Sequence, residues 1–395
     1  MKISAMKHHE FYEKLPRRAR YNLSDACGAT ATLQDILSVD EIAAIASVPL
    51  TYGSVEGRDD LRAGIYNLYQ QLYPELGVDH ITVLSGTQEG LFSIMACILE
   101  PGDEVIGMLP CYPSLSDLPA CFGGVFKPVA LNSENRWQPS IDDFAAQISK
   151  RTKGIVINSP HNPTGMLLDQ DFVDSLLALC EQHDLYLICD DVFAFSDFSG
   201  IGCQLNVLKY EKAILANVLS KTFGLPGVRI GWVMTRNEEL SKLIRDLKTY
   251  NSICQSQLDE QVACFVMQKA DALIKRNNEI VRENIELFDA FVANNDSLSW
   301  HRPEAGMLGL VHSSEPLKPL LDSWFEKGVL VLPGDLFGVE GDYFRVGFGK
   351  KEFELVGVLI SKVLKELAKN PDNNSKAEND VQKEVIDLCG SFTIY

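Results

Sequence analysis

Lys221 lies in the segment NVLSKTFGLPGVRIGW (217–232), between an apolar run typical of a β-strand and a glycine-rich turn. A buried ammonium group without partners costs on the order of several kcal/mol, so this amine either reaches solvent or is needed there for its reactivity. An amine that loses its proton in a partly desolvated site is a nucleophile and a base. An isolated Ser-Lys pair is more often a lysine that extends to solvent, so other residues must separate these interpretations.

Further distinctive residues occur where other predicted strands end. The strand candidates are HITVLSG (80–86), DEVIGMLP (103–110), GIVINSP (154–160), LYLICDD (185–191), AILANVLS (213–220) and IGWVMT (230–235). Their continuous apolar character is typical of parallel strands covered on both faces. Ligands bind at the carboxyl ends of such sheets, which is where Ser85, Tyr112, the segment 158–165, Asp190 and Lys221 fall. The sequence therefore predicts a doubly wound α/β domain with one site at this edge.

Length and composition indicate a globular protein of two or three domains. The chain has 395 residues, 46% of them hydrophobic and 23% charged. No run approaches the ~18 apolar residues of a membrane span, and the N-terminus has no apolar segment typical of a secretory signal. The formal net charge of −18 argues against non-specific binding to nucleic acid or to an anionic membrane.

The ten cysteines are scattered, with no C-x-x-C pair, and several lie inside apolar runs. This pattern favours buried thiols in a reducing cytoplasm over a disulfide framework or a zinc site. We therefore expect a cytoplasmic protein without a metal.

A second region follows residue 250. A long helical pattern leads into the strand candidates GMLGLVH (306–312), GVLVLPG (328–334) and YFRVGFG (343–349), which predict a smaller α+β domain. We expect residues 1–45 to form an N-terminal arm and part of the small domain. Residues 46–255 are expected to form the large domain, 256–368 a linking helix and the small domain, and 369–395 a polar C-terminal tail.

Several motifs in this order resemble the class I/II aminotransferases, the fold-type I enzymes that use pyridoxal 5′-phosphate. They are SGTQEG (85–90), NSPHNPTG (158–165), ICDD (188–191), SKTFGLPGVRIGW (220–232) and YFRVGFG (343–349). The resemblance covers about residues 20–365, and its specificity comes from the order and spacing of the motifs. It implies a large, mostly parallel doubly wound domain with a smaller α+β domain, a free amino acid as substrate, and a homodimer with shared active sites.

The resemblance assigns the covalent attachment of the cofactor and the binding of its phosphate. Lys221 matches the lysine that holds the cofactor as an imine, and the same amine can later carry the Cα proton. Arg229 is expected to bind the phosphate through its planar fork of donors. Ser85, Gly86 and Thr87 precede or open a predicted helix, where N–H groups and a hydroxyl can face an anion. A simple helix N-cap is the alternative there, and both can hold.

Other matched residues are expected around the cofactor ring and the substrate. Asp190 corresponds to the aspartate that holds the ring N–H and keeps the ring an electron sink. Asn162 corresponds to the asparagine at the 3′-oxygen, and Tyr112 to the aromatic residue that stacks on the ring. Arg345 matches the partner of the substrate α-carboxylate; without a ligand it would need an acidic partner. Tyr52 matches the tyrosine that reaches the phosphate of the neighbouring subunit.

Two positions depart from the family pattern. Phe193 stands where the family usually has a tyrosine that donates to the 3′-oxygen, and Val218 stands where it often has serine or threonine. Each missing hydroxyl removes a donor worth about 1–3 kcal/mol in a dry site. Phe193, together with the PHNP motif and Y-x-S-L-S (112–116), is similar to capreomycidine synthase and related arginine cyclases. That similarity implies loss of a side-chain hydroxyl from a hydroxylated arginine and ring closure by the guanidine nitrogen.

The sequence leaves the reaction and the recognition of the substrate side chain open. Fold alone does not choose between cyclisation and ordinary transamination with a 2-oxo acid. A cationic substrate would need carboxylates, for which Glu10, Asp25 and Asp117 are candidates, whereas His8 and His9 are consistent with a flexible arm. A regulatory domain fused to a DNA-binding segment is disfavoured, because the N-terminus has no helix-turn-helix of adequate length.

Overall fold

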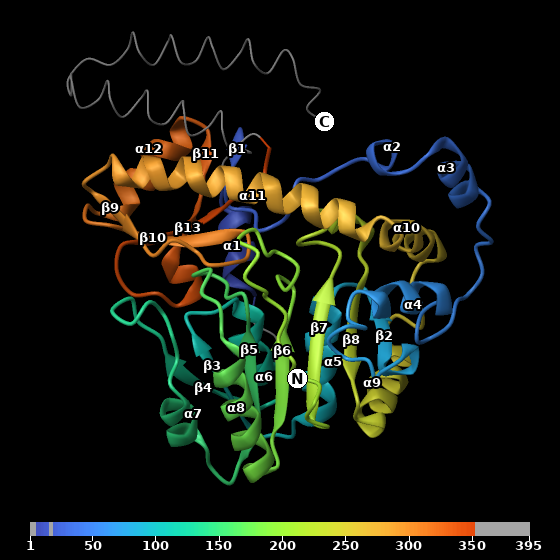
Figure 1. Ribbon diagram of the computed structural model, residues 1–395. Helices are drawn as coiled ribbons and strands as arrows, with labels where there is room; N and C mark the ends of the chain where they lie inside the picture. The colour runs from blue at the N-terminus through green and yellow to red at the C-terminus, as the bar shows by residue number, and fades with distance from the viewer. Residues whose placement is uncertain (1–4, 16–18, 352–395) are drawn as a thin grey trace.

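The computed structural model describes residues 5–15 and 19–351, and its main feature is a seven-stranded sheet (Figure 1). The strand order is β2-β8-β7-β6-β5-β3-β4, in which β8 runs antiparallel to both of its neighbours and all other pairs are parallel. The strands are β2 (Ile81–Leu84), β3 (Glu104–Leu109), β4 (Val125–Ala130), β5 (Thr152–Asn158), β6 (Tyr186–Asp190), β7 (Ala213–Val218) and β8 (Gly231–Thr235). The predicted α/β class and mostly parallel sheet are confirmed.

All six strand candidates of the large domain form strands, and β4 is the strand that the sequence pattern did not predict. β4 is the edge strand of the sheet, most of its side chains are partly or fully exposed, and Pro128 lies within it. Proline is tolerated on an edge strand because one side of that strand needs no ladder hydrogen bond. The continuous apolar signal that marks the central strands is therefore absent from β4.

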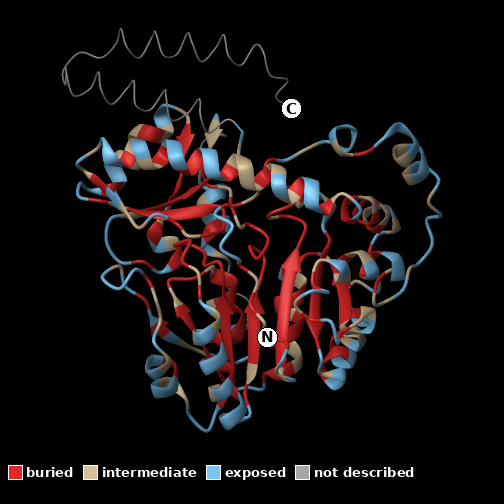
Figure 2. Ribbon diagram, in the orientation of Figure 1, coloured by how far each residue is buried: buried red, intermediate tan, exposed pale blue. Residues whose placement is uncertain are grey.

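Side chains of β5 show that both faces of the sheet are covered. Ile155 and Ile157 pack in one core cluster together with Leu176 of helix α8, whereas Val156 belongs to a separate cluster with Leu91 of helix α5. In Figure 2 the strands form a buried layer, and the helices turn exposed faces outward. The helices of this region are α4 (Asp59–Asn67), α5 (Thr87–Ile98), α6 (Pro113–Cys121), α7 (Ile141–Gln147), α8 (Gln170–His183) and α9 (Glu238–Tyr250), with short 3-10 turns η1 (Val78–His80) and η2 (Pro226–Val228).

A second region packs beyond the carboxyl edge of the large sheet. Its four-stranded antiparallel sheet has the order β12-β13-β10-β9, and the long helix α11 lies across it (Figure 1). The ring of Phe288 on α11 contacts the rings of Trp300 and Phe348 at centroid distances of 5.0 and 5.4 Å. The elements are α10 (Gln257–Met267), α11 (Ala270–Ala293), β9 (Leu298–Trp300), β10 (Leu308–Ser313), α12 (Leu317–Glu326), β11 (Val329–Leu330), β12 (Leu332–Pro333), η3 (Gly334–Phe337) and β13 (Tyr343–Gly347).

The N-terminal segment is attached to this second region. β1 (Tyr21–Asn22) pairs in parallel with β11, and the polypeptide then continues through α2 (Leu33–Ile36) and α3 (Val39–Ala46). Before β1, residues Lys7–Glu13 form helix α1. The domain boundaries stay a prediction, and the predicted tail at 369–395 lies outside the described residues.

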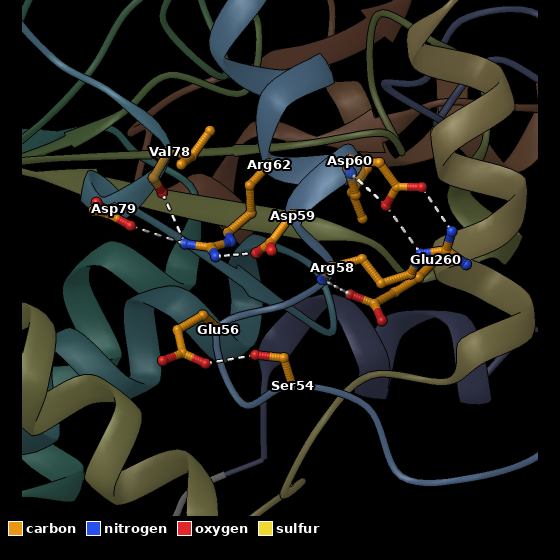
Figure 3. A network of polar contacts seen from close by, with 10 residues as sticks. Ser54, Glu56, Arg58, Asp59, Asp60, Arg62, Val78, Asp79 and Glu260 are labelled. Carbon is orange, nitrogen blue, oxygen red and sulfur yellow. Dashed lines mark hydrogen bonds and ion pairs between the residues drawn. The ribbon is translucent and has the colours of Figure 1, made fainter.

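A polar network anchors the segment between Tyr52 and α4 (Figure 3). The backbone N–H of Arg58 donates to Glu260 of α10 at 3.0 Å, and its guanidinium pairs with Asp60 at 2.6 Å. Arg62 donates to the carbonyl of Val78 at 3.0 Å. These contacts hold the segment against α10 and the start of β2.

All nine described cysteines are free thiols. Among the described helices, none combines the length and the apolar character required to cross a lipid bilayer.

Candidate active site

A cavity of about 250 Å³ lies where strands β5, β6 and β7 end. Six of the predicted site residues line it: Thr87, Tyr112, Asn162, Asp190, Lys221 and Arg229. The cavity also contacts both positions that depart from the family pattern, Phe193 and Val218. The carboxyl ends of neighbouring parallel strands meet at one edge of the sheet, and this explains why residues far apart in sequence gather here.

One end of the cavity is a set of hydrogen-bond donors at the start of α5. The helix begins at Thr87 with no side chain capping its N-terminus, and the buried hydroxyl of Thr87 has no hydrogen-bond partner within the described residues. Arg229 extends to the same place, where it donates to the carbonyl of Ser85 at 3.0 Å and to the hydroxyl of Ser220 at 3.3 Å. First-turn N–H groups, a free hydroxyl and a guanidinium together suit a dianion such as a phosphate.

Two glycines allow this arrangement. Gly86 has φ +86°, and a Cβ built there would lie 2.5 Å from Nη2 of Arg229. A Cβ on Gly231 of β8 would lie 2.7 Å from the backbone of Gly86 and Thr87. Any larger residue at either position would displace the donors that face the cavity.

Asp190 supplies a buried carboxylate at the end of β6. It is only 4% exposed, and its Oδ1 accepts a hydrogen bond from the backbone N–H of Val192 at 3.3 Å. Burial raises the pKa of Asp190 to about 6, against the opposing effects of the Val192 N–H and of the positive charge on Lys221. A protonated ring nitrogen against this carboxylate would supply the hydrogen bond and positive charge that favour its ionised form.

Lys221 follows β7 and is partly buried beside the ring of Phe193. Its Nζ lies 5.8 Å from the centroid of that ring, and it makes no hydrogen bond or ion pair with any residue that the structure describes. Phe193 itself is almost fully buried and brings no hydroxyl to the cavity. The amine is therefore available to a ligand in the cavity.

Arg345 of β13 joins the second region to the cavity. Its guanidinium is 4% exposed, donates to Oδ1 of Asn162 at 2.9 Å and to the carbonyl of Ser24, and lies 4.7 Å above the ring of Phe337. Burial lowers the pKa of Arg345 to about 10. No carboxylate forms an ion pair with it among residues 5–15 and 19–351, and its Nε has no partner there. The acidic structural partner that the sequence left open is absent from this part of the protein.

Four predicted residues do not line this cavity: Ser85, Gly86, Tyr52 and Arg345. The hydroxyl of Ser85 donates to Gln255 at 2.8 Å, so Ser85 faces the site only through its backbone. Tyr52 is 82% exposed on the molecular surface. Its expected role on a neighbouring subunit stays a prediction.

The three candidate carboxylates for a cationic substrate lie in different surroundings. Asp25 pairs with Lys350 at 3.3 Å and follows Ser24, the residue whose carbonyl accepts from Arg345. Glu10 is exposed and pairs with Lys14 at 3.5 Å. Asp117 is exposed on α6. Asp25 is thus the carboxylate among the three that adjoins the site.

Sequence reasoning assigned no role to two residues that shape the site, Asn158 and His8. Asn158 accepts from the backbone N–H of Asn162 at 2.7 Å and donates to the carbonyl of Asp190 at 2.9 Å, which orients both of its neighbours. The position of Asn158 at the carboxyl end of a predicted strand is the sequence feature that could have identified its role. His8 was assigned to a flexible arm, but it is buried on helix α1 against Tyr112 and Phe337.

The residues present fit pyridoxal 5′-phosphate. The unpartnered hydroxyl of Thr87, the Gly86 backbone and Arg229 suit the phosphate, and the buried carboxylate of Asp190 suits the protonated ring nitrogen. Lys221 lines the same cavity as Thr87, Arg229 and Asp190, and it provides the amine to which the cofactor can attach.

Comparisons with known proteins agree with this chemistry. The sequence model of the family "Aminotransferase class I and II" matches residues 25–359. Capreomycidine synthase of Streptomyces vinaceus is 31% identical over 71% of this chain and 72% of its own length. Arginine–pyruvate transaminase of Pseudomonas aeruginosa is 28% identical over 73% of this chain and 75% of its own.

Solved structures share the fold. A PLP-dependent aminotransferase from Streptococcus suis superposes with a TM-score of 0.83 at 27% identity, over 91% of this chain and 96% of that one. A double mutant of Thermus thermophilus aspartate aminotransferase gives a TM-score of 0.78 at 23% identity, over 91% and 96% of the two chains, and supports the fold alone. The matched family, the shared fold and the fit of the cavity lead to one conclusion: this chain belongs to the class I and II aminotransferases and is a pyridoxal-phosphate-dependent amino-acid enzyme.

Proposed function

We propose that this enzyme acts at the α-carbon of a free L-amino acid with a guanidine side chain, and that it eliminates a side-chain hydroxyl and closes a ring. The observation that carries the proposal is the buried guanidinium of Arg345, which has no carboxylate partner among the described residues and reaches the cavity through Asn162. A buried charge of this kind is costly unless a ligand neutralises it. The α-carboxylate of an amino acid is the natural partner for the N–H groups of Arg345 that Asn162 and Ser24 do not use.

The other residues divide the work around the bound amino acid. Pyridoxal 5′-phosphate, when bound, draws electron density away from the α-carbon. Lys221 is positioned to hold the cofactor and then to carry the Cα proton on its amine. The carboxylate of Asp190 would hold the proton on the ring nitrogen, Asn162 would bind the 3′-oxygen, and Arg229 with the first turn of α5 would hold the phosphate.

The guanidine side chain is inferred from the relatives and from charge. One relative, arginine–pyruvate transaminase, is named for arginine, and another, capreomycidine synthase, belongs with the cyclases that Phe193 and Y-x-S-L-S resemble. The net charge of −18 is compatible with a cationic substrate, and Asp25 adjoins the site. We therefore assign Asp25 as a carboxylate that attracts the cationic side chain.

The departures at Phe193 and Val218 favour cyclisation over transamination. Both side chains line the cavity and neither offers a hydroxyl, so the donors of an ordinary transaminase are missing beside Lys221. In the proposed reaction Lys221 takes the Cα proton and later returns it. The bond from carbon to the hydroxyl oxygen breaks, its electron pair leaves with the oxygen, and a guanidine nitrogen forms the new C–N bond while its proton completes the released water. The balance is one water lost, with no oxidant and no oxo acid.

Transamination of the same class of amino acid is the second candidate. It is favoured by the similarity to arginine–pyruvate transaminase and by the presence of Lys221, Asp190, Asn162 and Arg345, which both reactions need. In that case the amino group passes to a 2-oxo acid and no water is lost.

We also propose that two copies associate and that Tyr52 of one reaches the phosphate end of the other. Its 82% exposure in the single chain leaves the phenol available for such a contact. Sedimentation of wild type and Tyr52→Phe, with the cofactor affinity of each, tests this. Weaker cofactor binding by an intact dimer is expected, whereas a monomeric wild type would contradict it.

The deciding experiment is an incubation of cofactor-loaded enzyme with arginine, its β- and γ-hydroxy derivatives and common amino acids. Each is followed by mass spectrometry with and without pyruvate or 2-oxoglutarate. Loss of one water without an oxo acid is expected. Amino-group transfer that depends on the oxo acid, with no dehydrated product, would replace cyclisation by transamination. Turnover of other amino acids alone would overturn the guanidine assignment.

A further inference from the structure

His8 is a buried imidazole with no hydrogen-bond partner among the residues that the structure describes. It is 8% exposed, and neither Nδ1 nor Nε2 is paired there. A phenylalanine or leucine would fill the same volume without burying two polar atoms. Buried polar groups almost always have a hydrogen-bond partner, so two ring nitrogens without one need an explanation.

Helix α1 presents two opposite faces, and His8 is on the one that meets the active site. The ring of His8 contacts the edge of Phe337 at 4.5 Å and the ring of Tyr112 at 5.9 Å. One turn later, Tyr12 bonds to the hydroxyl of Ser24 at 2.7 Å. On the other face His9 pairs with Glu13 at 3.3 Å, and both are exposed.

The position of His8 is fixed relative to the groups that bracket the substrate. Phe337, which it touches, also lies under the guanidinium of Arg345, and Tyr112 lines the cavity that contains Lys221. His8 is close enough to both cations for each to act on its ionisation. His8 is not among the residues that line the 250 Å³ cavity, but of the two rings that it contacts, Tyr112 lines the cavity and Phe337 lies under Arg345.

The charge state of His8 suits a cationic ligand. Burial, reinforced by the positive charges of Arg345 and Lys221, lowers the pKa of His8 to about 4. The ring is neutral at pH 7 and keeps one nitrogen as a hydrogen-bond acceptor. A carboxylate at this position would pair with Arg345 and compete with the α-carboxylate of the substrate, whereas a neutral acceptor leaves Arg345 unpaired.

We propose that His8 is a specificity-determining residue, whose ring nitrogen accepts a hydrogen bond from an N–H group on the side chain of the bound amino acid. The proposal deepens the proposed function and rests on it, because a guanidine is the donor that the substrate class supplies. His8 discriminates between side chains and takes no part in proton transfer at Cα.

The test compares His8→Phe, His8→Gln and His9→Ala on two amino acids. L-Arginine, or the hydroxyarginine that wild type converts, carries the donor, and norleucine is an unbranched aliphatic amino acid without it. His8→Phe keeps the aromatic contacts with Tyr112 and Phe337 and removes both nitrogens. His8→Gln keeps a donor and an acceptor, and His9→Ala is the matched control on the exposed face.

We expect His8→Phe to lower kcat/KM for the guanidine substrate about 10- to 100-fold and to leave the binding of norleucine, which has no hydroxyl to eliminate, unchanged. Most of the loss should appear in KM. His8→Gln should recover part of it, and His9→Ala should match wild type. A readout without turnover is calorimetric binding of arginine and norleucine to enzyme whose cofactor has been reduced onto the protein with borohydride, where only arginine should bind more weakly.

Three results would overturn the proposal. An equal loss for both amino acids, or a lower melting temperature and cofactor content in His8→Phe that account for the loss, would make His8 a packing residue. An unchanged ratio of the arginine and norleucine binding affinities would remove its role in specificity. If wild type neither binds nor converts arginine or its hydroxy derivatives, the guanidine assignment itself fails, and this is seen before any variant is compared.

Discussion

The guanidinium of Arg345 donates a hydrogen bond to the side-chain oxygen of Asn162 at 2.9 Å, which joins β13 of the second region to the loop after β5 of the large sheet. The site is therefore built from two sheets, one of which carries the cavity and the other the buried cation. A ligand that contacts both the cavity and the guanidinium of Arg345 must therefore pass close to this hydrogen bond.

Replacing Arg345 by methionine should raise KM for the amino acid at least about 100-fold, because two charge-assisted hydrogen bonds of roughly 1.5–3 kcal/mol each are lost. The melting temperature of the cofactor-free protein should change little, because the loss of hydrogen bonds to Asn162 and Ser24 opposes the removal of a buried cation that has no carboxylate partner. Steady-state kinetics and thermal unfolding measure the two effects. An unchanged KM would remove the carboxylate role of Arg345.

Lys221→Ala should abolish covalent attachment of the cofactor and turnover, because no other amine from the described residues lines the cavity. Borohydride reduction followed by peptide mass spectrometry shows which lysine carries the added mass. Lys209→Ala is a suitable control, since that lysine pairs with Asp174 at 2.5 Å on the surface. If the Lys221 variant still gained the mass or turned over substrate, the assignment would be wrong.

Phe193→Tyr should move the pH titration of the bound cofactor's absorbance to lower pH. A new phenol beside Lys221 can donate to the ring oxygen of the cofactor, and one hydrogen bond to a charged group of roughly 1.5–3 kcal/mol corresponds to a shift of about one or two pH units. Phe195→Tyr provides the comparison, because its ring contacts Tyr69 and Phe223. An unmoved curve in the Phe193 variant would mean that the oxygen lies elsewhere.

Asp190 should make the stability of the cofactor-free protein fall as the pH rises. Its pKa is raised from 3.8 to about 6 by burial, so its contribution is fully present below 3.8 and is lost as the pH passes through 6. Between pH 4 and pH 7, wild type should lose about 2 kcal/mol of unfolding free energy relative to Asp190→Asn. Urea unfolding at each pH measures the difference. Parallel curves for the two proteins would contradict the raised pKa.

Gly86→Ala should weaken cofactor binding tenfold or more, because the new Cβ would meet Nη2 of Arg229 at 2.5 Å and the backbone has φ +86°. With ψ 166° this conformation lies in a region that is essentially restricted to glycine, and it costs another residue about 1–3 kcal/mol in addition. Gly227→Ala lies in the loop near Arg229 and has no neighbour within 4 Å of its Cβ, so it serves as the control. Equilibrium dialysis against pyridoxal 5′-phosphate gives both affinities, and equal values would exclude the steric argument.

The large sheet was predictable because burial on both faces leaves a direct mark on the sequence. β5 and β7 read as continuous apolar runs, and topology then brings their carboxyl ends together, which is why Lys221, Asp190 and Asn162 could be assigned to one site. β4 was not predictable in this way, since an exposed edge strand with Pro128 carries no such run.

The contacts of the substrate half could not be predicted from the sequence. His8 meets Tyr112 and Phe337, residues far along the sequence, and no local pattern reports such a long-range contact. The lack of a carboxylate partner for Arg345 among the described residues is likewise a property of the packed structure. Motif matching indicates which residue types are present, but the surroundings of a buried charge depend on the whole fold.

The phosphate end of the cavity also depends on strand register. Leu84 of β2 pairs with Gly231 of β8, and this pairing sets the close approach between Gly231 and Gly86. The donors that face the cavity can therefore assemble only after two segments distant in sequence have paired in the native register, a type of contact that forms slowly during folding. During refolding, cofactor uptake should thus report the completion of long-range sheet pairing, whereas helix content should appear earlier.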